Sequence, residues 1–494
     1  MPNNIQLTPA QQNVLDKIQD FIHSNDRIFV LKGYAGTGKT TLVRFIINHL
    51  NEQQILYKLL ATTGRAAKIL KDYSGFEAST IHHMIYKFHN LNKDLSNIDA
   101  QAPQADKIGQ LMLVFAPVTL PEDSGETIYI VDEASMISDA VDPYVTQATF
   151  GRGKLLTELI NYDTNPKSKF IFVGDPCQLP PITSTNSPAL DNQYLQSNFH
   201  IGVQDAELTQ IMRQNNGNDI TETAARIRLM YQKAPFDESV YGGQKVWGQH
   251  LPLGGRRNIL LHPDKENMLD DYFRVMQQKG PENVIYVCRQ NKKCYEMSQQ
   301  IRHRLGFEQT INVGDFLMVI QNQLTTGLMN GDMVEVLSIN NDYHKTLQVN
   351  SRYRSYTNLK FLEVRIRELF SKKEKTTLLL VNTLEQNNNL DSDQQTGLFI
   401  DFAVRMQRIG ITQRKNMEAF THALGNDPYL NALRCSYGYA VTCHKAQGGE
   451  WDDVYVDMPG NMTLCPTKEK FQWIYTALTR AKQTAHFVND WYIG

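Results

Sequence analysis

The stretch Arg27-Ile-Phe-Val-Leu-Lys32, followed by Gly33-Tyr-Ala-Gly-Thr-Gly-Lys39-Thr40, decides the fold of this chain. Its apolar first half predicts a buried strand, and its second half fits the pattern GxxxxGK[ST]. Glycines let such a loop curl so that its N–H groups point at phosphate oxygens. Apolar residues at helical spacing over Thr40–Leu50 predict a helix, whose positive N-terminus adds to the attraction. We therefore expect nucleotide binding by Gly33, Gly36, Thr37, Gly38, Lys39, Thr40 and Thr41.

Further apolar runs follow this unit in the sequence. Ile55–Ala61, Thr127–Val131 and Lys169–Val173 predict more strands of one parallel sheet, with helical stretches between them. A second set follows, with strands at Asn283–Val287 and Asp453–Asp457 and a helix at Lys292–Leu305. Alternation of this kind predicts two doubly wound α/β domains.

Two regions break the alternation. Short strands separated by turns predict a small β-barrel inserted in the second α/β domain; they are Gly314–Gln321, Gly331–Ser338, Thr346–Val349, Leu362–Arg367 and Thr376–Leu384. Met84–Glu126 is irregular and predicts a subdomain inserted in the first domain. Gln386–Gln395 is interpreted as a polar loop.

Composition sets broad limits. The 494 residues, 41% of them apolar, suffice for two to four domains, and a net charge of −2 gives no global sign of a nucleic-acid partner. The six cysteines lack CxxC spacing, which indicates reduced thiols and not a disulfide frame, zinc site or iron–sulfur cluster. With no run of about eighteen apolar residues and no secretory signal at the N-terminus, we expect a cytoplasmic protein without membrane contact.

Two polar segments follow predicted strands. Asp132-Glu133 ends the run TIYIV, where one carboxylate can hold Mg²⁺ and the other can deprotonate an attacking water. Alone, such a pair is usually a solvated turn, but its place downstream of a phosphate-binding loop favours catalysis. The amide of Gln178, in Gly174–Pro181, could contact a γ-phosphate, although this loop could equally be a Pro-rich turn.

The order and spacing of eight segments resemble superfamily 1 helicases, in the branch that contains RecD and the phage Dda helicase. These segments are Leu7–Asn13, Ala61–Ala67, Ala78–His83, Val131–Ser135, Gly174–Pro181, Leu208–Arg213, Tyr439–Glu450 and Tyr475–Ala481. Thr62 replaces the proline of the RecD form of the second segment. The resemblance runs from about residue 5 to the C-terminus.

The resemblance implies an ATP site with Mg²⁺ between two RecA-like domains. It implies catalytic roles for Lys39, Asp132, Glu133, Gln178, Arg213 and Arg480, with Thr40 and Asp132 holding the metal. Gln11 would read the adenine edge, and Glu450 would lie near the nucleotide sugar. The RecA-like domains would span residues 1–236 and residues 237–312 with 433–494, and an SH3-like β insertion would span residues 313–432.

The same resemblance implies a motor that moves on single-stranded DNA, from 5′ to 3′, and meets junctions with duplex DNA. Its track would be lined by Thr63, Arg65, Thr80, His82, Thr442, His444 and Lys445. Phe88 and Phe115 could form a strand-separating wedge or merely pack the first insertion. Two alternatives stay open: an RNA-directed helicase, and the motor subunit of a nuclease complex.

Overall fold

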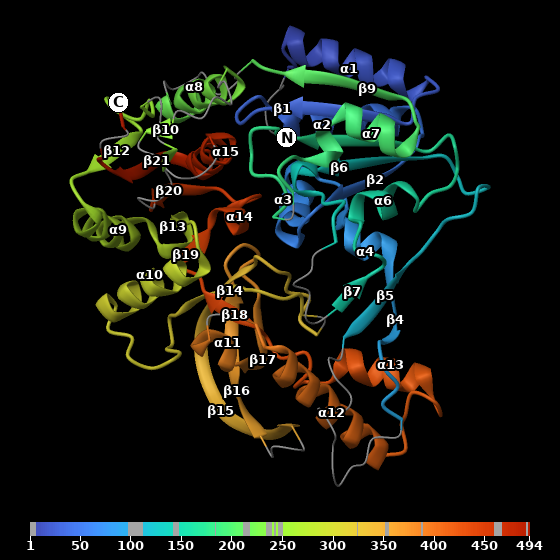
Figure 1. Ribbon diagram of the computed structural model, residues 1–494, viewed down its shortest axis with the longest axis vertical. Helices are drawn as coiled ribbons and strands as arrows, with labels where there is room; N and C mark the ends of the chain where they lie inside the picture. Colours follow the sequence, from blue (N-terminus) through green and yellow to red (C-terminus); the bar gives the residue numbers. More distant parts are fainter. Residues whose placement is uncertain are drawn as a thin grey trace.

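Two α/β domains lie side by side, with an antiparallel sheet and a helix pair beneath them (Figure 1). The computed structural model describes residues 6–96, 112–141, 148–182, 184–210, 218–233, 240–241, 244–245, 250–323, 325–350, 355–386, 389–458, 467–490 and 493–494.

The first domain is built on a six-stranded parallel sheet with the order β3-β2-β6-β8-β1-β9. Its strands are β1 (Ile28–Gly33), β2 (Leu56–Ala61), β3 (Ala78–Thr80), β6 (Thr127–Asp132), β8 (Lys169–Gly174) and β9 (Val203–Leu208). The four strands predicted from the sequence are confirmed, each within one residue at either end.

Helices cover both faces of this sheet because alternate strand residues point to opposite sides. Phe29 and Leu31 pack with α1 (Pro9–Ile22), α2 (Lys39–Glu52) and α3 (Gly64–Ser74). Ile28 and Val30 pack on the other face. The elements of that face are α4 (Ile81–Ile85), α6 (Leu155–Ile160), α7 (Asn192–Phe199) and the short 3-10 helices Ala134–Met136 and Pro188–Leu190.

The second domain has a five-stranded parallel sheet with the order β12-β21-β20-β13-β19. Its strands are β12 (Ile259–His262), β13 (Val284–Cys288), β19 (Ala440–Thr442), β20 (Trp451–Val456) and β21 (Ala481–Val488). The helices are α8 (Asp219–Lys233), α9 (Lys265–Lys279), α10 (Asn291–Arg304), α14 (Cys443–Ala446), α15 (Thr467–Leu478) and the 3-10 helix Pro281–Asn283. A two-stranded ribbon pairs β10 (Val240–Tyr241) with β11 (Gln244–Lys245).

Helix α8 packs against the second domain, although the predicted boundary put it in the first. Ile220, Ala224 and Ile227 of α8 join the core formed by α15 and the second sheet. The boundary at residue 236, which the resemblance implied, put this segment in the first domain. Its apolar face therefore covers the neighbouring domain.

The predicted β insertion forms a five-stranded antiparallel sheet with the order β17-β16-β15-β14-β18. Its strands are β14 (Phe316–Val319), β15 (Met333–Asn350), β16 (Ser355–Glu368), β17 (Glu374–Leu380) and β18 (Cys435–Tyr437). The prediction of separate strands at Gly331–Ser338 and Thr346–Val349 is wrong, because both belong to β15. Bulges in the pairing of β15 with β16 produce the irregular pattern that suggested a break.

Three helices follow β17: α11 (Asn382–Glu385), α12 (Ser392–Arg408) and α13 (Met417–Asn426). The interpretation of Gln386–Gln395 as a loop is wrong beyond Asp391. The Asp391 carboxylate accepts a hydrogen bond from the backbone of Gln394, and the Gln394 side chain bonds back to Asp391, so this polar segment starts α12. Helix α12 buries Leu398, Phe399 and Phe402 beneath the sheet.

The first insertion contains a three-stranded sheet of β4 (Tyr86–Leu91), β5 (Leu113–Pro117) and β7 (Ala148–Phe150). Strand β7 comes from outside the predicted range 84–126. The Phe115 ring stacks on Phe150 with 4.7 Å between centroids and meets Phe88 edge-on at 5.7 Å. Both candidate wedge residues therefore pack this small sheet.

A short connector joins β18 of the antiparallel sheet to β19 of the second α/β domain. It consists of Gly438 and Tyr439, and it is bonded to both sheets: Gly438 N donates to Phe316 O (2.8 Å), and Tyr286 N donates to Tyr439 O (3.1 Å). A Cβ on Gly438 would lie 2.7 Å from Met333 Cε and 3.2 Å from a backbone carbon of Leu317. The connector therefore has no room for a side chain at Gly438.

Candidate active site

The phosphate-binding loop runs between β1 and α2. Gly36 (φ 76°) and Gly38 (φ 80°) adopt left-handed backbone conformations that suit glycine, and the buried Thr37 hydroxyl donates to Tyr34 O at 2.8 Å. Lys39 Nζ donates to Gly33 O (2.6 Å) and Tyr34 O (3.2 Å). The ammonium group thus lies against the loop, within reach of an anion held there.

Two carboxylates stand at the end of β6. Glu133 has a left-handed backbone (φ 52°), which is strained for a residue with a Cβ, and its N–H donates to Asp132 Oδ1 at 2.9 Å. Burial raises the pKa of Asp132, against the opposing effects of the Glu133 N–H and Lys39. Burial and the Asp132 charge raise the pKa of Glu133, while Arg480 and Lys39 lower it. A carboxyl group with a raised pKa is suited to accept a proton from water.

A third carboxylate, Asp175, was not singled out from the sequence. It is fully buried after β8 and accepts hydrogen bonds from Tyr475 OH (2.7 Å) and Cys177 N (2.9 Å). Burial raises its pKa, and the Lys39 charge lowers it. Its place at the carboxyl end of a strand, like that of Asp132, is the signal that could have identified it.

Tyr475 of α15 connects the two domains at this site. Besides donating to Asp175, its hydroxyl accepts a hydrogen bond from Ala35 N in the phosphate-binding loop at 2.8 Å. The sequence marked the segment Tyr475–Ala481 for its arginine and gave no reason to choose the tyrosine.

The loop after β8 is bonded to the second domain along its backbone. Gln178 O accepts from Gln472 Nε2 (3.1 Å), Leu179 N donates to Thr476 Oγ1 (3.0 Å), and Leu179 O accepts from Gln447 Nε2 (3.0 Å). Among the described residues, the buried side-chain oxygen of Gln178 has no hydrogen-bond partner. The loop therefore joins the two domains through its backbone and leaves this side-chain oxygen unpaired.

Arg480 follows α15 and is only 5% exposed. Its guanidinium donates to Thr476 O (3.1 Å) and Gly449 O (3.3 Å), and its charge lowers the pKa of Glu133 and of Asp175. The structure thus places Lys39, Asp132, Glu133 and Arg480 near one another. Arg213, the other predicted arginine, lies outside the described residues.

The remaining predicted nucleotide ligands surround the loop. Gln11 Nε2 donates to Thr37 O (3.2 Å), and Gln11 Oε1 accepts from Thr8 N (3.1 Å), so this amide ties α1 to the loop. Thr40 and Thr41 occupy the first turn of α2 and are partly exposed. Glu450 is exposed, immediately before β20.

The predicted strand-binding threonines each begin a helix directly after a strand. The hydroxyl group of each threonine accepts a hydrogen bond from the backbone N–H three residues later in the chain. The distances are 3.1 Å for Thr63, 3.2 Å for Thr80 and 3.4 Å for Thr442, and the three residues cap α3, α4 and α14. They therefore lie at the carboxyl ends of β2, β3 and β19, the edge at which α/β sheets bind ligands.

Arg65 and His82 lie in packed surroundings. The Arg65 guanidinium is 4.6 Å from the centroid of Trp451 in the other domain, and burial lowers the pKa of Arg65 to about 10. The His82 ring contacts Tyr86 (5.6 Å) and Phe150 (5.1 Å), and burial lowers its pKa to about 4. The structure thus places Arg65 at the domain boundary and His82 against the first insertion.

Lys445 is exposed, and burial lowers the pKa of the neighbouring His444. Lys445 and Thr442 line a pocket of about 220 Å³ between the second sheet and the antiparallel sheet. Its other lining groups include Asn291, Tyr295 and Asn389. The pocket combines an amine, amides and an aromatic ring.

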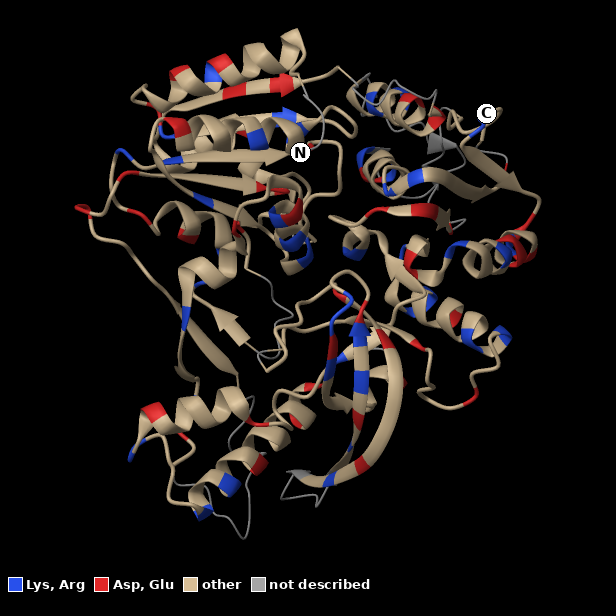
Figure 2. Ribbon diagram, turned by 180° about the vertical axis from the view of Figure 1, so that it is seen from behind, with Lys and Arg blue, Asp and Glu red and all other residues tan. Residues whose placement is uncertain are grey.

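Charges of both signs are interspersed along the helices and strands (Figure 2), in keeping with the net charge of −2. Among the described residues, no helix is both long enough and apolar enough to cross a membrane.

The parallel sheets and the phosphate-binding loop define a nucleotide-binding protein of the RecA-like α/β class. Residues 6–235 match the family model of an AAA domain, and residues 437–488 match that of a UvrD-like helicase C-terminal domain. The second match covers the segments that contain Thr442 and Arg480.

Several known proteins are similar in sequence, among them the following three. Uncharacterized protein R530 of Acanthamoeba polyphaga mimivirus is 22% identical over 97% of this chain and 99% of its own length. The ATP-dependent RecD2 DNA helicase of Deinococcus radiodurans is 26% identical over 52% of this chain and 28% of its own length. The ATP-dependent DNA helicase Dda of phage T4 is 27% identical over 68% of this chain and 66% of its own length. These matches confirm the resemblance of the chain to superfamily 1 helicases of the RecD and Dda type.

Among solved structures, a Pif1 helicase from Bacteroides in complex with ADP-AlF3 and ssDNA aligns with 99% of this chain and 94% of its own chain. The identity is 16% and the TM-score is 0.48.

Proposed function

We propose that this chain is an ATP-dependent DNA helicase that moves along single-stranded DNA from 5′ to 3′. The observation that carries the proposal is the meeting of Lys39, Asp132 and Glu133 from one domain with Arg480 from the other. A nucleotide site completed by two domains can convert hydrolysis into domain movement. The similarity to RecD2 and Dda, both named ATP-dependent DNA helicases, supports the choice of substrate.

The site residues divide the chemistry of hydrolysis among them. Lys39 and the loop amides hold the phosphates of ATP, while Thr40 and Asp132 hold Mg²⁺. Glu133 accepts a proton from the attacking water, and Gln178 contacts the γ-phosphate. Arg480, with Arg213, stabilises the charge that develops in the transition state; such an arginine contributes on the order of 10³–10⁵ in rate.

Coupling follows from the contacts of the loop after β8. Tyr475, Thr476 and Gln447 hold this loop from the second domain, so a change at the γ-phosphate alters contacts between domains. The proposed domains are residues 1–236 and residues 237–312 with 433–494, with an SH3-like insertion at residues 313–432. Two elements cross these boundaries, because α8 packs on the second domain and β18 pairs with the sheet of the insertion. Each opening and closing moves the two halves of the track relative to one another.

The track runs over the carboxyl edges of both sheets. Thr63, Arg65, Thr80 and His82 contact the strand from the first domain, and Thr442, His444 and Lys445 contact it from the second. Most of these contacts are to phosphates, so binding weakens with salt and tolerates any sequence. Tyr295, in the pocket beside Lys445, offers a ring on which a base can stack.

Unwinding assays on duplexes with a 5′ or a 3′ single-stranded tail test activity and direction together. We expect ATP-dependent unwinding of the 5′-tailed duplex, and ATPase stimulation by single-stranded DNA above that by RNA. Lys39→Ala should fold normally and lose both activities. Near wild-type hydrolysis by folded Lys39→Ala would refute the assigned site, and unwinding of only the 3′-tailed duplex would refute the direction.

A further inference from the structure

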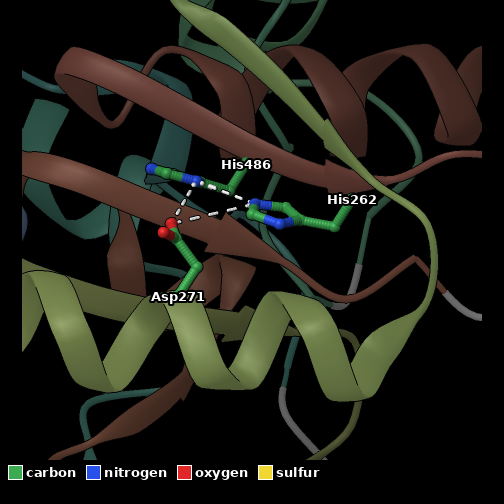
Figure 3. A group of neighbouring side chains, drawn as sticks. All are labelled: His262, Asp271 and His486. Carbon is green, nitrogen blue, oxygen red and sulfur yellow. Dashed lines mark hydrogen bonds and ion pairs between the residues drawn. The ribbon is translucent and has the colours of Figure 1, made fainter.

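A group of potential metal ligands lies in the second domain, apart from the residues of the candidate ATP site. His262 ends β12, Asp271 lies in α9, and His486 lies in β21; their side chains point toward one another (Figure 3). Within the described residues, this is the only group of three or more histidine, cysteine or acidic side chains whose ligand atoms lie within 4.8 Å of one another.

The spacing of the three atoms fits one small cation. His262 Nε2 lies 3.1 Å from His486 Nδ1, and Asp271 Oδ2 lies 3.4 Å from His486 Nδ1 and 3.9 Å from His262 Nε2. In a tetrahedral zinc site with bonds of about 2.0–2.1 Å, neighbouring ligand atoms are about 3.3–3.4 Å apart. We propose that His262, Asp271 and His486 bind one divalent transition-metal ion, Zn²⁺, as a structural site.

Hydrogen bonds behind the ligands orient them. His486 Nε2 donates to Asp453 Oδ1 at 3.2 Å, the carboxylate–histidine arrangement common in zinc sites. The other ring nitrogen of His486, Nδ1, lies 3.4 Å from Asp271 Oδ2 and 3.1 Å from His262 Nε2, so the three ligand atoms face one another. Tyr455 OH donates to Asp271 Oδ2 at 2.8 Å and fixes the carboxylate.

The two oxygens of the Asp271 carboxylate have different neighbours. Arg274 binds one oxygen, Asp271 Oδ1, and its side chain is 58% exposed. This ion pair occupies Oδ1, while Oδ2 accepts from Tyr455 OH and faces the two histidines.

The position indicates a structural role. Strand β12 is the edge of the second sheet, and the ion would link it to β21 and to α9, which packs on that sheet. The side chains of His262 and Asp271 are 13% and 16% exposed, so an ion can enter and a water molecule can complete the tetrahedron. Because zinc would bind only the folded domain, it would stabilise that domain by an amount that rises with the logarithm of the zinc concentration.

The test is zinc binding by the full-length chain after treatment with a chelator. We expect one Zn²⁺ per chain in competition with a chromophoric chelator, a rise in melting temperature on adding zinc, and the intense visible absorption of tetrahedral Co²⁺ on substitution. His262→Ala should abolish the spectrum and weaken binding more than tenfold. Asp271→Asn, which preserves shape, should also weaken it, and Asp453→Asn should weaken it about 10–100-fold.

His303→Ala is the matched control, because His303 is an exposed histidine on α10 that belongs to no such group. It should bind zinc like the wild type. Failure of the wild type to bind one zinc ion would overturn the proposal. So would unchanged binding by both His262→Ala and Asp271→Asn, since any bound zinc would then lie elsewhere. Neither result would affect the ATPase, whose residues are separate.

Discussion

Removing the hydroxyl group of Tyr475 is the smallest change that tests the link between the two domains. In Tyr475→Phe, Asp175 loses a hydrogen bond of 2.7 Å, and Ala35 N loses its acceptor. A hydrogen bond to a charged group contributes about 1.5–3 kcal/mol, and 1.4 kcal/mol is a factor of ten. The arrangement in which Tyr475 joins the domains should therefore become about 10- to 100-fold less populated relative to open forms.

Arg480 should retract with Tyr475, because its guanidinium is bonded to Thr476 O at the end of the same helix. We expect kcat for DNA-stimulated ATP hydrolysis to fall about 10- to 100-fold at saturating ATP and DNA. Steady-state phosphate release measures this rate, and circular dichroism verifies folding.

Tyr129→Phe is a matched control. The Tyr129 hydroxyl donates to Asp163 at the same distance, 2.7 Å, and both residues are fully buried inside the first domain. This variant should lose stability, by about 1.5–3 kcal/mol, and keep its kcat below its melting temperature. If Tyr475→Phe keeps kcat within twofold, or if both variants lose it equally, the proposed role of Tyr475 as an inter-domain link is wrong.

Three further changes test other parts of the structure. Glu133→Gln should bind ATP normally but hydrolyse it about 10²–10⁴-fold more slowly in single-turnover assays; loss of ATP affinity would contradict its role as a base. Lys68→Ala removes the partner of Asp332 (2.5 Å) and Glu368 (2.7 Å), each 5% exposed, and should lower the free energy of unfolding in urea by about 1–3 kcal/mol; an unchanged midpoint would contradict this. The pKa of His82 is lowered from 6.5 to about 4, so the unfolded chain binds more protons between these values and stability falls as pH drops from 6.5 to 4. In His82→Phe, the melting temperature should fall less between pH 6.5 and 4 than it does in the wild type. If the two proteins show the same dependence of melting temperature on pH, His82 is not buried in its neutral form.

Local sequence patterns predicted the nucleotide-binding unit of the first domain because its residues are close together in the sequence. The phosphate-binding loop, β1 and α2 lie within residues 28–52, and each apolar run is long enough to reveal its strand. The location of Asp132 and Glu133 could be predicted because they stand at the end of the apolar run that forms β6. In such units, local propensity and tertiary packing favour the same structure.

Other features depend on contacts that no local pattern encodes. Asp175 and Tyr475 are 300 positions apart, and α8 packs on a sheet whose strands all come later in the chain. Arg65 lies over the ring of Trp451, another residue that is distant in the sequence. Helix α12 was missed because its first turn is polar, although the capping pair Asp391 and Gln394 is visible in the sequence.

The connector Gly438-Tyr439 is a short joint between the antiparallel sheet and β19, the strand that ends at Thr442. It is too short to act as a loose tether, and it is bonded at 2.8 Å to one sheet and at 3.1 Å to the other. A sideways force on the far end of β15 would thus be transmitted through β18 and β19 to Thr442, instead of being absorbed by slack chain. In the proposed motor, the stiffness of this joint would set how much of each domain movement reaches the DNA, and a longer, flexible joint would let the motor hydrolyse ATP without pulling.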